Sequence, residues 1–410
     1  MNQSFTNKYG DFLSMLLLLA TYITFAQTPK NSVDYKIGDG LNFSLNDGNY
    51  QFNLGGFIQP IFSNTKIDGA KAENQFNSRR SFLQFSGDAK REKVSFLLQL
   101  DYSLNQPLLD AWIAYHPTEN ISIFFGQKQT FVNNREMTYR EDRLQFTDRS
   151  FLSKNFSRTG REFGVFVTSK FGDDFGFAPM LAVTSGDGRN SFGTDSRDTD
   201  LGGIKYGGRL DVYPLGFFKE GNDLTSSDLE REEKPKIVIG FAGSKNIGAS
   251  NAVGEGHGNY VLYDAAGLNN YPDYTQLYAD FLVKYQGFSF LAEYINATAS
   301  NIDLTYTNAT TTTILAPTQI SEYLVLGDSF NFQLGYVFTN GFSVDGRYEI
   351  TNQEFANNAN SILQDAKAYT VGISKYFVNN KLKVQTSYSN FNPEVGNSIN
   401  QFELLFQITF

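Results

Sequence analysis

Basic side chains are most closely spaced in the segment 128–161, which reads KQTFVNNREMTYREDRLQFTDRSFLSKNFSRTGR. Its basic residues are Lys128, Arg135, Arg140, Arg143, Arg149, Lys154, Arg158 and Arg161, and its acidic residues are Glu136, Glu141, Asp142 and Asp148. Eight basic against four acidic residues give about +4, within a chain whose net charge is −9. A guanidinium group stays charged near neutral pH and can bind two phosphate oxygens at once. The segment therefore predicts attraction of anions if it lines a narrow space. If it is a solvated loop, the same charges pair with each other.

Other residue types that could perform chemistry are sparse. The chain has no cysteine, which excludes disulfides and thiolate metal sites. Its two histidines, His116 and His257, have no metal-ligand partner at useful spacing. The loop GDGRNSFGTDSRDTD (186–200) has acids at alternating positions and could bind Ca²⁺, or it is a plain solvated loop. We expect no enzyme activity, no cofactor and no resident metal, and the net negative charge argues against general nucleic-acid binding.

The elements that would position the basic segment repeat one pattern of alternating apolar and polar residues. In FNFQLGYVFTN (330–340), for example, every second residue is aromatic or aliphatic, which is the period of a β-strand and not of a helix. Sixteen such segments lie near 50–62, 79–88, 93–103, 107–116, 120–128, 161–171, 175–187, 203–213, 236–245, 274–285, 287–298, 329–339, 341–351, 367–377, 381–390 and 400–410.

The connections between these segments alternate in length. Short ones such as 89–92, 172–174 and 340–341 follow every second segment, and most of the others are long and polar. Short turns on one rim and long loops on the other are typical of a membrane β-barrel. We therefore predict an all-β, 16-stranded antiparallel transmembrane barrel over 50–410, with short periplasmic turns and long extracellular loops. The charged segment 214–235 should be a short turn in this scheme, and the sequence does not explain its length.

The last segment, QFELLFQITF (401–410), shows how the two faces of such a wall differ. Every second residue from Phe402 to Phe410 is apolar, and the intervening residues are mostly polar. If the apolar faces meet lipid, the charged residues of the wall point into the lumen, because a charge in hydrocarbon costs about 2–4 kcal/mol at mid-bilayer. This parity places inward Arg80, Lys205, Arg209, Lys284, Arg347, Lys383, Asp101, Asp110, Asp211, Asp280, Glu293, Asp345 and Glu349.

The N-terminus has the pattern of a targeting segment. Lys8 precedes the apolar run FLSMLLLLATYITFA, which ends at Ala26 and is short for a membrane-spanning helix. We interpret 1–26 as a secretory signal peptide; an uncleaved anchor helix is the alternative. Residues 27–49 then form an N-terminal periplasmic segment, and the protein is expected in the bacterial outer membrane, in contact with its lipids.

Several stretches resemble the phosphate-selective porin O/P family of bacterial outer-membrane porins. They are NSRRSFLQFSGDA (77–89), FLLQLDYS (96–103), LLDAWIAYHP (108–117), ISIFFGQKQTF (121–131) and KYGGRLDVYPLGFF (205–218). The resemblance implies a 16-stranded porin barrel, usually a homotrimer, with an inward-folded loop at the constriction. It also implies basic pore residues that select phosphate or polyphosphate in some members, whereas other members are unspecialised channels.

Together these features predict an outer-membrane porin for passive diffusion of small hydrophilic solutes, with a preference for anions such as phosphate. The alternatives are a general porin without selectivity, and a plugged barrel that acts as a surface docking or assembly partner. The residues that we expect along the anion pathway are Lys128, Arg135, Arg140, Arg143, Arg149, Arg158, Arg80, Lys205 and Arg209.

Overall fold

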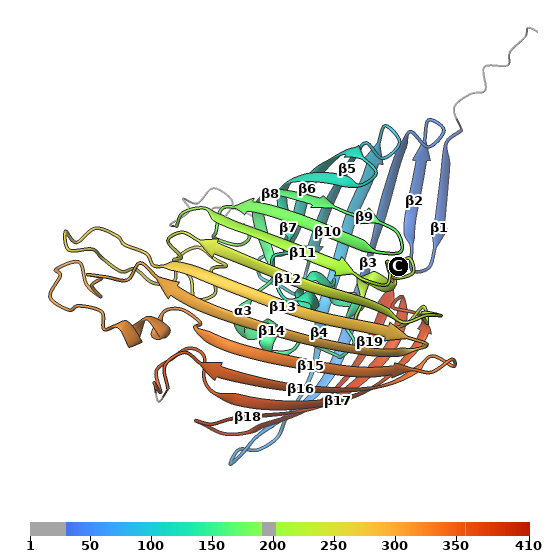
Figure 1. The fold of residues 1–410 in the computed structure, drawn as a ribbon. Helices are drawn as coiled ribbons and strands as arrows, with labels where there is room; N and C mark the ends of the chain where they lie inside the picture. Colours follow the sequence, from blue (N-terminus) through green and yellow to red (C-terminus); the bar gives the residue numbers. More distant parts are fainter. Residues whose placement is uncertain (1–29, 191–201, 357) are drawn as a thin grey trace, which may run out of the picture.

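The chain folds into a closed antiparallel β-barrel (Figure 1). The computed structural model describes residues 30–190, 202–356 and 358–410. Within these residues 16 strands form the barrel wall. They are β3 (Tyr50–Ile67), β4 (Glu73–Ala89), β5 (Val94–Asp101), β6 (Leu108–Thr118), β7 (Ile121–Gln129), β8 (Arg161–Ser169), β10 (Gly176–Thr184), β11 (Lys205–Tyr213), β12 (Lys236–Asn246), β13 (Asp273–Tyr285), β14 (Phe288–Ser300), β15 (Gly327–Val337), β16 (Phe342–Gln353), β17 (Ala366–Val378), β18 (Leu382–Pro393) and β19 (Ile399–Thr409).

The remaining described elements are short. They are the strands β1 (Ser32–Lys36), β2 (Gly40–Leu45) and β9 (Phe171–Gly172), the helices α2 (Arg135–Thr138) and α3 (Phe151–Phe156), and the 3₁₀ turns η1 (Glu141–Arg143), η3 (Asn222–Leu224) and η4 (Pro317–Glu322). No helix among the described residues is both long enough and apolar enough to cross a membrane. The predicted signal peptide 1–26 and most of the acidic loop 186–200 lie outside the described residues.

All sixteen predicted strands are present, and their alternating pattern has the predicted orientation. In β19 the apolar Phe402 and Phe406 are 39% and 50% exposed on the outer surface, whereas Glu403 and Gln407 are 5% and 2% exposed. The charged wall residues predicted to point inward are all buried. Side chains alternate faces in a strand, so the barrel has an apolar exterior and a charged interior.

The first hairpin of the wall is longer than the sequence indicates. β3 continues to Ile67, where the prediction ended at 62, and β4 begins at Glu73 instead of 79. The added residues SNTKI and ENQFNS are mainly polar on both faces, so they carry no lipid-facing signal. Backbone pairing between Thr65 and Glu73 holds them as strands nevertheless.

The seam that closes the barrel joins the last strand to the first. β19 pairs with the Phe57–Ile67 half of β3, and the N-terminal strand β2 pairs with Tyr50–Leu54 of the same strand. β4 occupies the other edge of β3 along both halves, so β2 and β19 lie end to end on one edge. At the junction, Gly56 and Phe410 exchange two backbone hydrogen bonds of 2.9 Å. A Cβ atom at Gly56 would lie 2.1 Å from the carbonyl oxygen of Phe82, so only glycine fits there.

The long connections gather at the rim opposite the C-terminus (Figure 1). A large buried apolar cluster lies under them: Leu152 and Phe156 of α3 pack with Leu262, Ile320 and Leu324 from the connections after β12 and β14. Burial of such side chains favours a fixed arrangement of the loops. This rim, called the long-loop rim below, is therefore packed against part of the chain that enters the barrel.

Candidate functional site

Residues 130–160, here called the long-loop insert, lie inside the barrel. The insert contains α2, η1 and α3, and most of its residues are buried. Its polar side chains bond to acids of the distant wall: Asn134 Nδ2 to Glu293 at 3.0 Å, Gln145 Nε2 to Asp345 at 2.6 Å, and Thr147 Oγ1 to Glu403 at 2.6 Å. Because these acids belong to β14, β16 and β19, the insert crosses the lumen.

Arginines of the insert and of the wall share the wall acids. Arg135 contacts Asp211 at 2.7 Å and Asp280 at 2.5 Å, and Arg209 contacts the same two carboxylates at 2.8 and 2.5 Å. Two guanidinium groups and two carboxylates thus form one neutral cluster. Buried charges of this kind are tolerated when they are paired and hydrogen-bonded. The cluster fastens α2 to β11 and β13.

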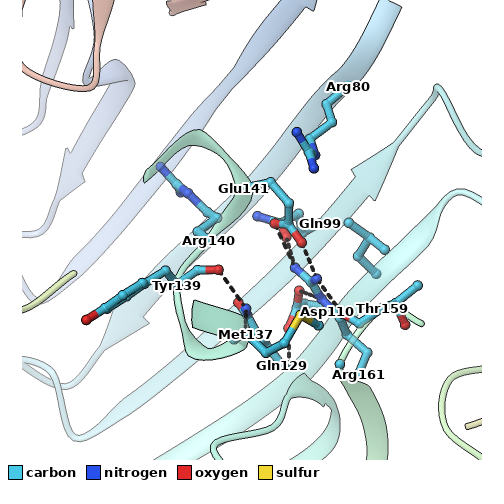
Figure 2. A network of polar contacts seen from close by, with 12 residues as sticks. Arg80, Gln99, Asp110, Gln129, Met137, Tyr139, Arg140, Glu141, Thr159 and Arg161 are labelled. Atoms are coloured by element: carbon cyan, nitrogen blue, oxygen red, sulfur yellow. Dashed lines mark hydrogen bonds and ion pairs between the residues drawn. The ribbon is translucent and has the colours of Figure 1, made fainter. Parts of the chain in front are cut away.

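A second cluster surrounds Glu141 of η1, which accepts hydrogen bonds from Arg161 at the start of β8 (Figure 2). Arg161 also contacts Asp110 of β6 at 3.3 Å, and Arg149 contacts Glu141 at 3.2 Å. Gln129 donates to the carbonyl oxygens of Met137 and Tyr139 at 2.5 and 3.0 Å in the same view. These contacts fasten the tip of the insert to β6, β7 and β8.

Several residues predicted for the anion pathway are therefore neutralised by a neighbouring acid. Arg135, Arg149 and Arg209 belong to the two clusters described above. Arg80 contacts Asp148 at 3.1 Å, and Lys205 contacts Glu162 at 2.6 Å. Their charges hold the insert against the wall or satisfy wall acids, and their part in an anion pathway stays a prediction.

Arg140 and Arg143 have partly accessible charges within the lumen. Both contact one carboxylate, that of Asp142. Arg140 donates to it through Nε at 2.5 Å and Nη2 at 2.7 Å, and Arg143 Nε lies 3.7 Å from it. Their side chains are 28% and 29% exposed. Arg140 points away from the Glu141 cluster (Figure 2). Among the described residues Asp142 is the only carboxylate that forms an ion pair with either guanidinium group, and Asp223 acts on Arg143 from a greater distance.

Lys128 and Arg158, the other two predicted pathway residues, lie apart from this pair. The Lys128 ammonium is 4.7 Å from the centre of the Phe124 ring and 5.9 Å from that of Trp112, at distances typical of cation–π contacts. Arg158 is exposed at the long-loop rim. Its backbone nitrogen, with those of Thr159 and Gly160, donates to the Glu255 carboxylate at 3.0–3.1 Å.

A second segment enters from the other rim and was not predicted to do so. Residues 214–235, here called the short-turn insert, connect β11 to β12, and Asn222, Thr225 and Ser227 within it are buried. Lys284 of β13 donates to the carbonyl oxygens of these three residues at 2.5, 2.7 and 2.9 Å. The ammonium group thereby uses all three of its donors. The sequence analysis did not explain the length of 214–235. The structure shows that this length lets the connection fold into the barrel.

Asp228 holds the end of the short-turn insert against the barrel rim. Its carboxylate accepts from Asn222 Nδ2 at 2.8 Å, from the Glu232 amide at 3.1 Å and from the Gly287 amide at 2.6 Å. Because Gly287 lies in the tight turn between β13 and β14, this acid joins the insert to the barrel rim. One feature of the sequence could have indicated that this connection folds inward: 214–235 is long and rich in acids, whereas a two-residue turn would be enough to join the strands.

The two inserts meet inside the barrel. Thr225 Oγ1 donates to the carbonyl oxygen of Arg143 at 2.8 Å, and Ser226 Oγ donates to Gln145 Oε1 at 3.1 Å. A cavity of about 370 Å³ remains between them and the wall of β7, β10 and β11. Its lining includes the guanidinium groups of Arg140 and Arg143 from the long-loop insert, and Asp223 and Leu224 from the short-turn insert. This cavity is the candidate site.

Comparisons with known proteins identify the fold only. No protein-family model and no curated protein matches the chain. Among solved structures, the outer-membrane channel DcaP of Acinetobacter baumannii is 11% identical, with a TM-score of 0.54 over 88% of this chain and 97% of that one. A loop L8 deletion mutant of OmpT, an outer-membrane protein of Vibrio cholerae, is 12% identical, with a TM-score of 0.53 over 88% and 99%. A trimer form of OmpT gives a TM-score of 0.50 at 11% identity. The chain therefore has the fold of outer-membrane barrels.

Proposed function

We propose that the protein is a porin of the bacterial outer membrane through which small hydrophilic solutes diffuse passively. The observation that supports this role best is the solvent-accessible cavity between the two inserts, lined by partly exposed arginines inside a closed barrel. A narrowed, charged lumen within an apolar exterior is the arrangement by which channels filter solutes. The chain acts without catalysis in this proposal, and outer-membrane lipids surround it.

Anions, with phosphate or polyphosphate as examples, are the preferred solutes in this proposal. Arg140 and Arg143 share a single carboxylate within ion-pair distance, and their partly exposed guanidinium groups line the cavity. A planar guanidinium can offer two donors to a phosphate. Pairing of Arg135, Arg149, Arg80, Lys205 and Arg209 with acids makes the preference depend on these two arginines instead of a long basic ladder.

The topology fits this location. Residues 1–26 would direct export, the short-turn rim with both ends of the barrel would face the periplasm, and the long loops would face outward. The hairpin of β1 and β2 would then be periplasmic. Assembly as a homotrimer is part of the same proposal. The alternative within this role is a channel without anion preference, in which the charge of Arg143 does not affect which solutes pass.

A plugged barrel that serves as a surface docking or assembly partner is the second candidate. The contact between the two inserts and the packed cluster under the long loops favour it, because both reduce the open cross-section. Solute passage separates the candidates, since a docking barrel need not conduct.

Single-channel recording in a planar bilayer tests the proposal. In a KCl gradient the reversal potential should lie on the anion side, and added phosphate should reduce the current. Arg140→Ala and Arg143→Ala should weaken both effects, whereas Arg91→Ala, in an exposed turn of the short-turn rim, should not. Conductance without anion preference would leave a general porin. A folded, heat-modifiable barrel that does not conduct would favour the docking role.

A further inference from the structure

The lining of the cavity between the inserts has charges of both signs, from two different segments. Arg140 and Arg143 reach it from the long-loop insert, and Asp223 reaches it from η3 of the short-turn insert. The segments that carry these charges are held at a fixed separation, because Thr225, two residues after Asp223, donates to the Arg143 carbonyl oxygen at 2.8 Å. The two sides of the cavity therefore keep their relative position.

Asp223 differs from the other acids of the lumen. The inward acids Asp211, Asp280 and Glu162 each contact a basic side chain within 4 Å. Asp223 is exposed, and within the described residues it takes part in no hydrogen bond or ion pair of its side chain. Arg143 and Lys284 act on Asp223 only at longer range, so its carboxylate and the guanidinium group of Arg143 are both available to a solute in the cavity.

Apolar and aromatic side chains also line the cavity, beside Gln129, Thr138 and the paired charges of Arg135, Arg209 and Asp211. Phe131 and Met180 line it from the long-loop insert and β10, and Leu224 lines it next to Asp223. The aromatic residues Tyr139 and Tyr213 complete that part of the wall. Such a surface can contact a short hydrocarbon chain, which an inorganic phosphate lacks.

We propose that this cavity binds small zwitterionic solutes of amino-acid type. The carboxylate lies against Arg140 and Arg143, the ammonium group against Asp223, and the carbon chain along Met180 and Leu224. This inference rests on the proposed passage of small hydrophilic solutes, and at this cavity it replaces the preference for simple anions with one for solutes that also carry an ammonium group. Opposite charges at the two ends of a bound solute favour it over a solute with charge of one sign, because each charge finds a partner of opposite sign.

Three probes of equal chain length test the inference: glutarate, 5-aminopentanoate and 1,5-diaminopentane. Isothermal titration of the folded barrel in detergent measures binding whether or not the barrel conducts. We expect 5-aminopentanoate to bind about tenfold more tightly than either of the others, since only it satisfies both sides. The same order should appear in the concentrations that block single-channel current.

Asp223→Asn should abolish the advantage of 5-aminopentanoate over glutarate, and Asp223→Glu should retain most of it. Asp174→Asn is the matched control, because Asp174 is an exposed acid of the same rim outside the cavity lining. Equal binding of 5-aminopentanoate and glutarate by the unmodified protein would overturn the inference, as would an unchanged preference in Asp223→Asn. Lack of conductance, by contrast, would contradict the proposed porin function and leave the titration to decide the binding site.

Discussion

Arg135 Nε of the long-loop insert lies 2.5 Å from Asp280 Oδ1 of β13, with both side chains almost fully excluded from solvent. These residues are 145 positions apart in the chain, so the contact joins an inserted helix to the far wall. It means that basic residues in the insert act first as anchors. Arg140 and Arg143 differ from these anchors because they share one carboxylate, Asp142, and remain partly exposed.

Removal of one partner from this anchor should loosen the insert. Asp280→Asn leaves Arg135 and Arg209 with only Asp211, and loss of one member of a buried ion pair costs about 3–5 kcal/mol. Urea unfolding in detergent should show this loss, and the insert should become sensitive to protease. Glu233→Gln, which breaks a pair between exposed Lys219 and Glu233 at 3.2 Å, should cost about 1 kcal/mol or less. Equal losses for the two variants would contradict the anchoring role.

The short-turn insert should depend on Lys284. Lys284→Met keeps the length of the side chain but leaves the carbonyl oxygens of Asn222, Thr225 and Ser227 without their donor, and unsatisfied buried carbonyls are costly. We expect a higher single-channel conductance and faster proteolysis within 214–235. Lys375→Met, at an exposed lysine of the same rim, serves as control. A variant with unchanged conductance and protection would show that the segment is held by other contacts.

Charge at the constriction and charge at the outer rim should respond differently to salt. Arg143→Gln should reduce anion selectivity at both low and high salt, because its effect acts on ions at close range. Arg158→Gln, at the exposed long-loop rim, should matter at 0.1 M salt and little at 1 M, where the screening length falls from about 10 Å to about 3 Å. Reversal potentials at the two salt concentrations measure both effects. Identical salt dependence of the two variants would argue against a constriction at Arg143.

The turn between β1 and β2 should loosen in acid. A hydrogen bond from Lys381 lowers the pKa of Asp39 below its usual value of 3.8, and Lys36 at 3.1 Å contributes. A lowered pKa means that the ionised form stabilises the hairpin above pH 3.8 and that this contribution disappears as the pH falls through the folded-state value. Hydrogen exchange of the β1–β2 amides should rise in that range. Asp39→Asn should show the fast exchange at neutral pH too, and a hairpin equally protected in both proteins would refute the link.

The barrel was predictable because its signal is repeated along the chain. Each wall strand buries one face and exposes the other, so residues such as Phe402 and Glu403 reveal their orientation through period two alone. The ends of β3 and β4 were missed because residues beyond the lipid-facing zone are polar on both faces. The pairing of β2 with β3 was missed for a related reason: five or six residues of alternation are a weak signal.

The candidate site was only partly predictable. Composition indicated that 128–161 is basic, and parity indicated that Asp211 and Asp280 face inward, but which arginine meets which acid depends on three-dimensional contacts. Asp223 was missed because neither alternation nor motif marks a connection that folds into a lumen. The only signal in the sequence was the length of 214–235, which exceeds that of the short turn expected at this position.

The end-to-end arrangement of β2 and β19 on one edge of β3 bears on how the barrel acquires a single register. A strand that slipped by one residue would turn its apolar face inward. With β2 already paired to Tyr50–Leu54, the incoming last strand has only the part of β3 from Gly56 onward available, and Phe410 abuts the hairpin. The N-terminal hairpin therefore prevents the last strand from slipping along β3 towards Tyr50.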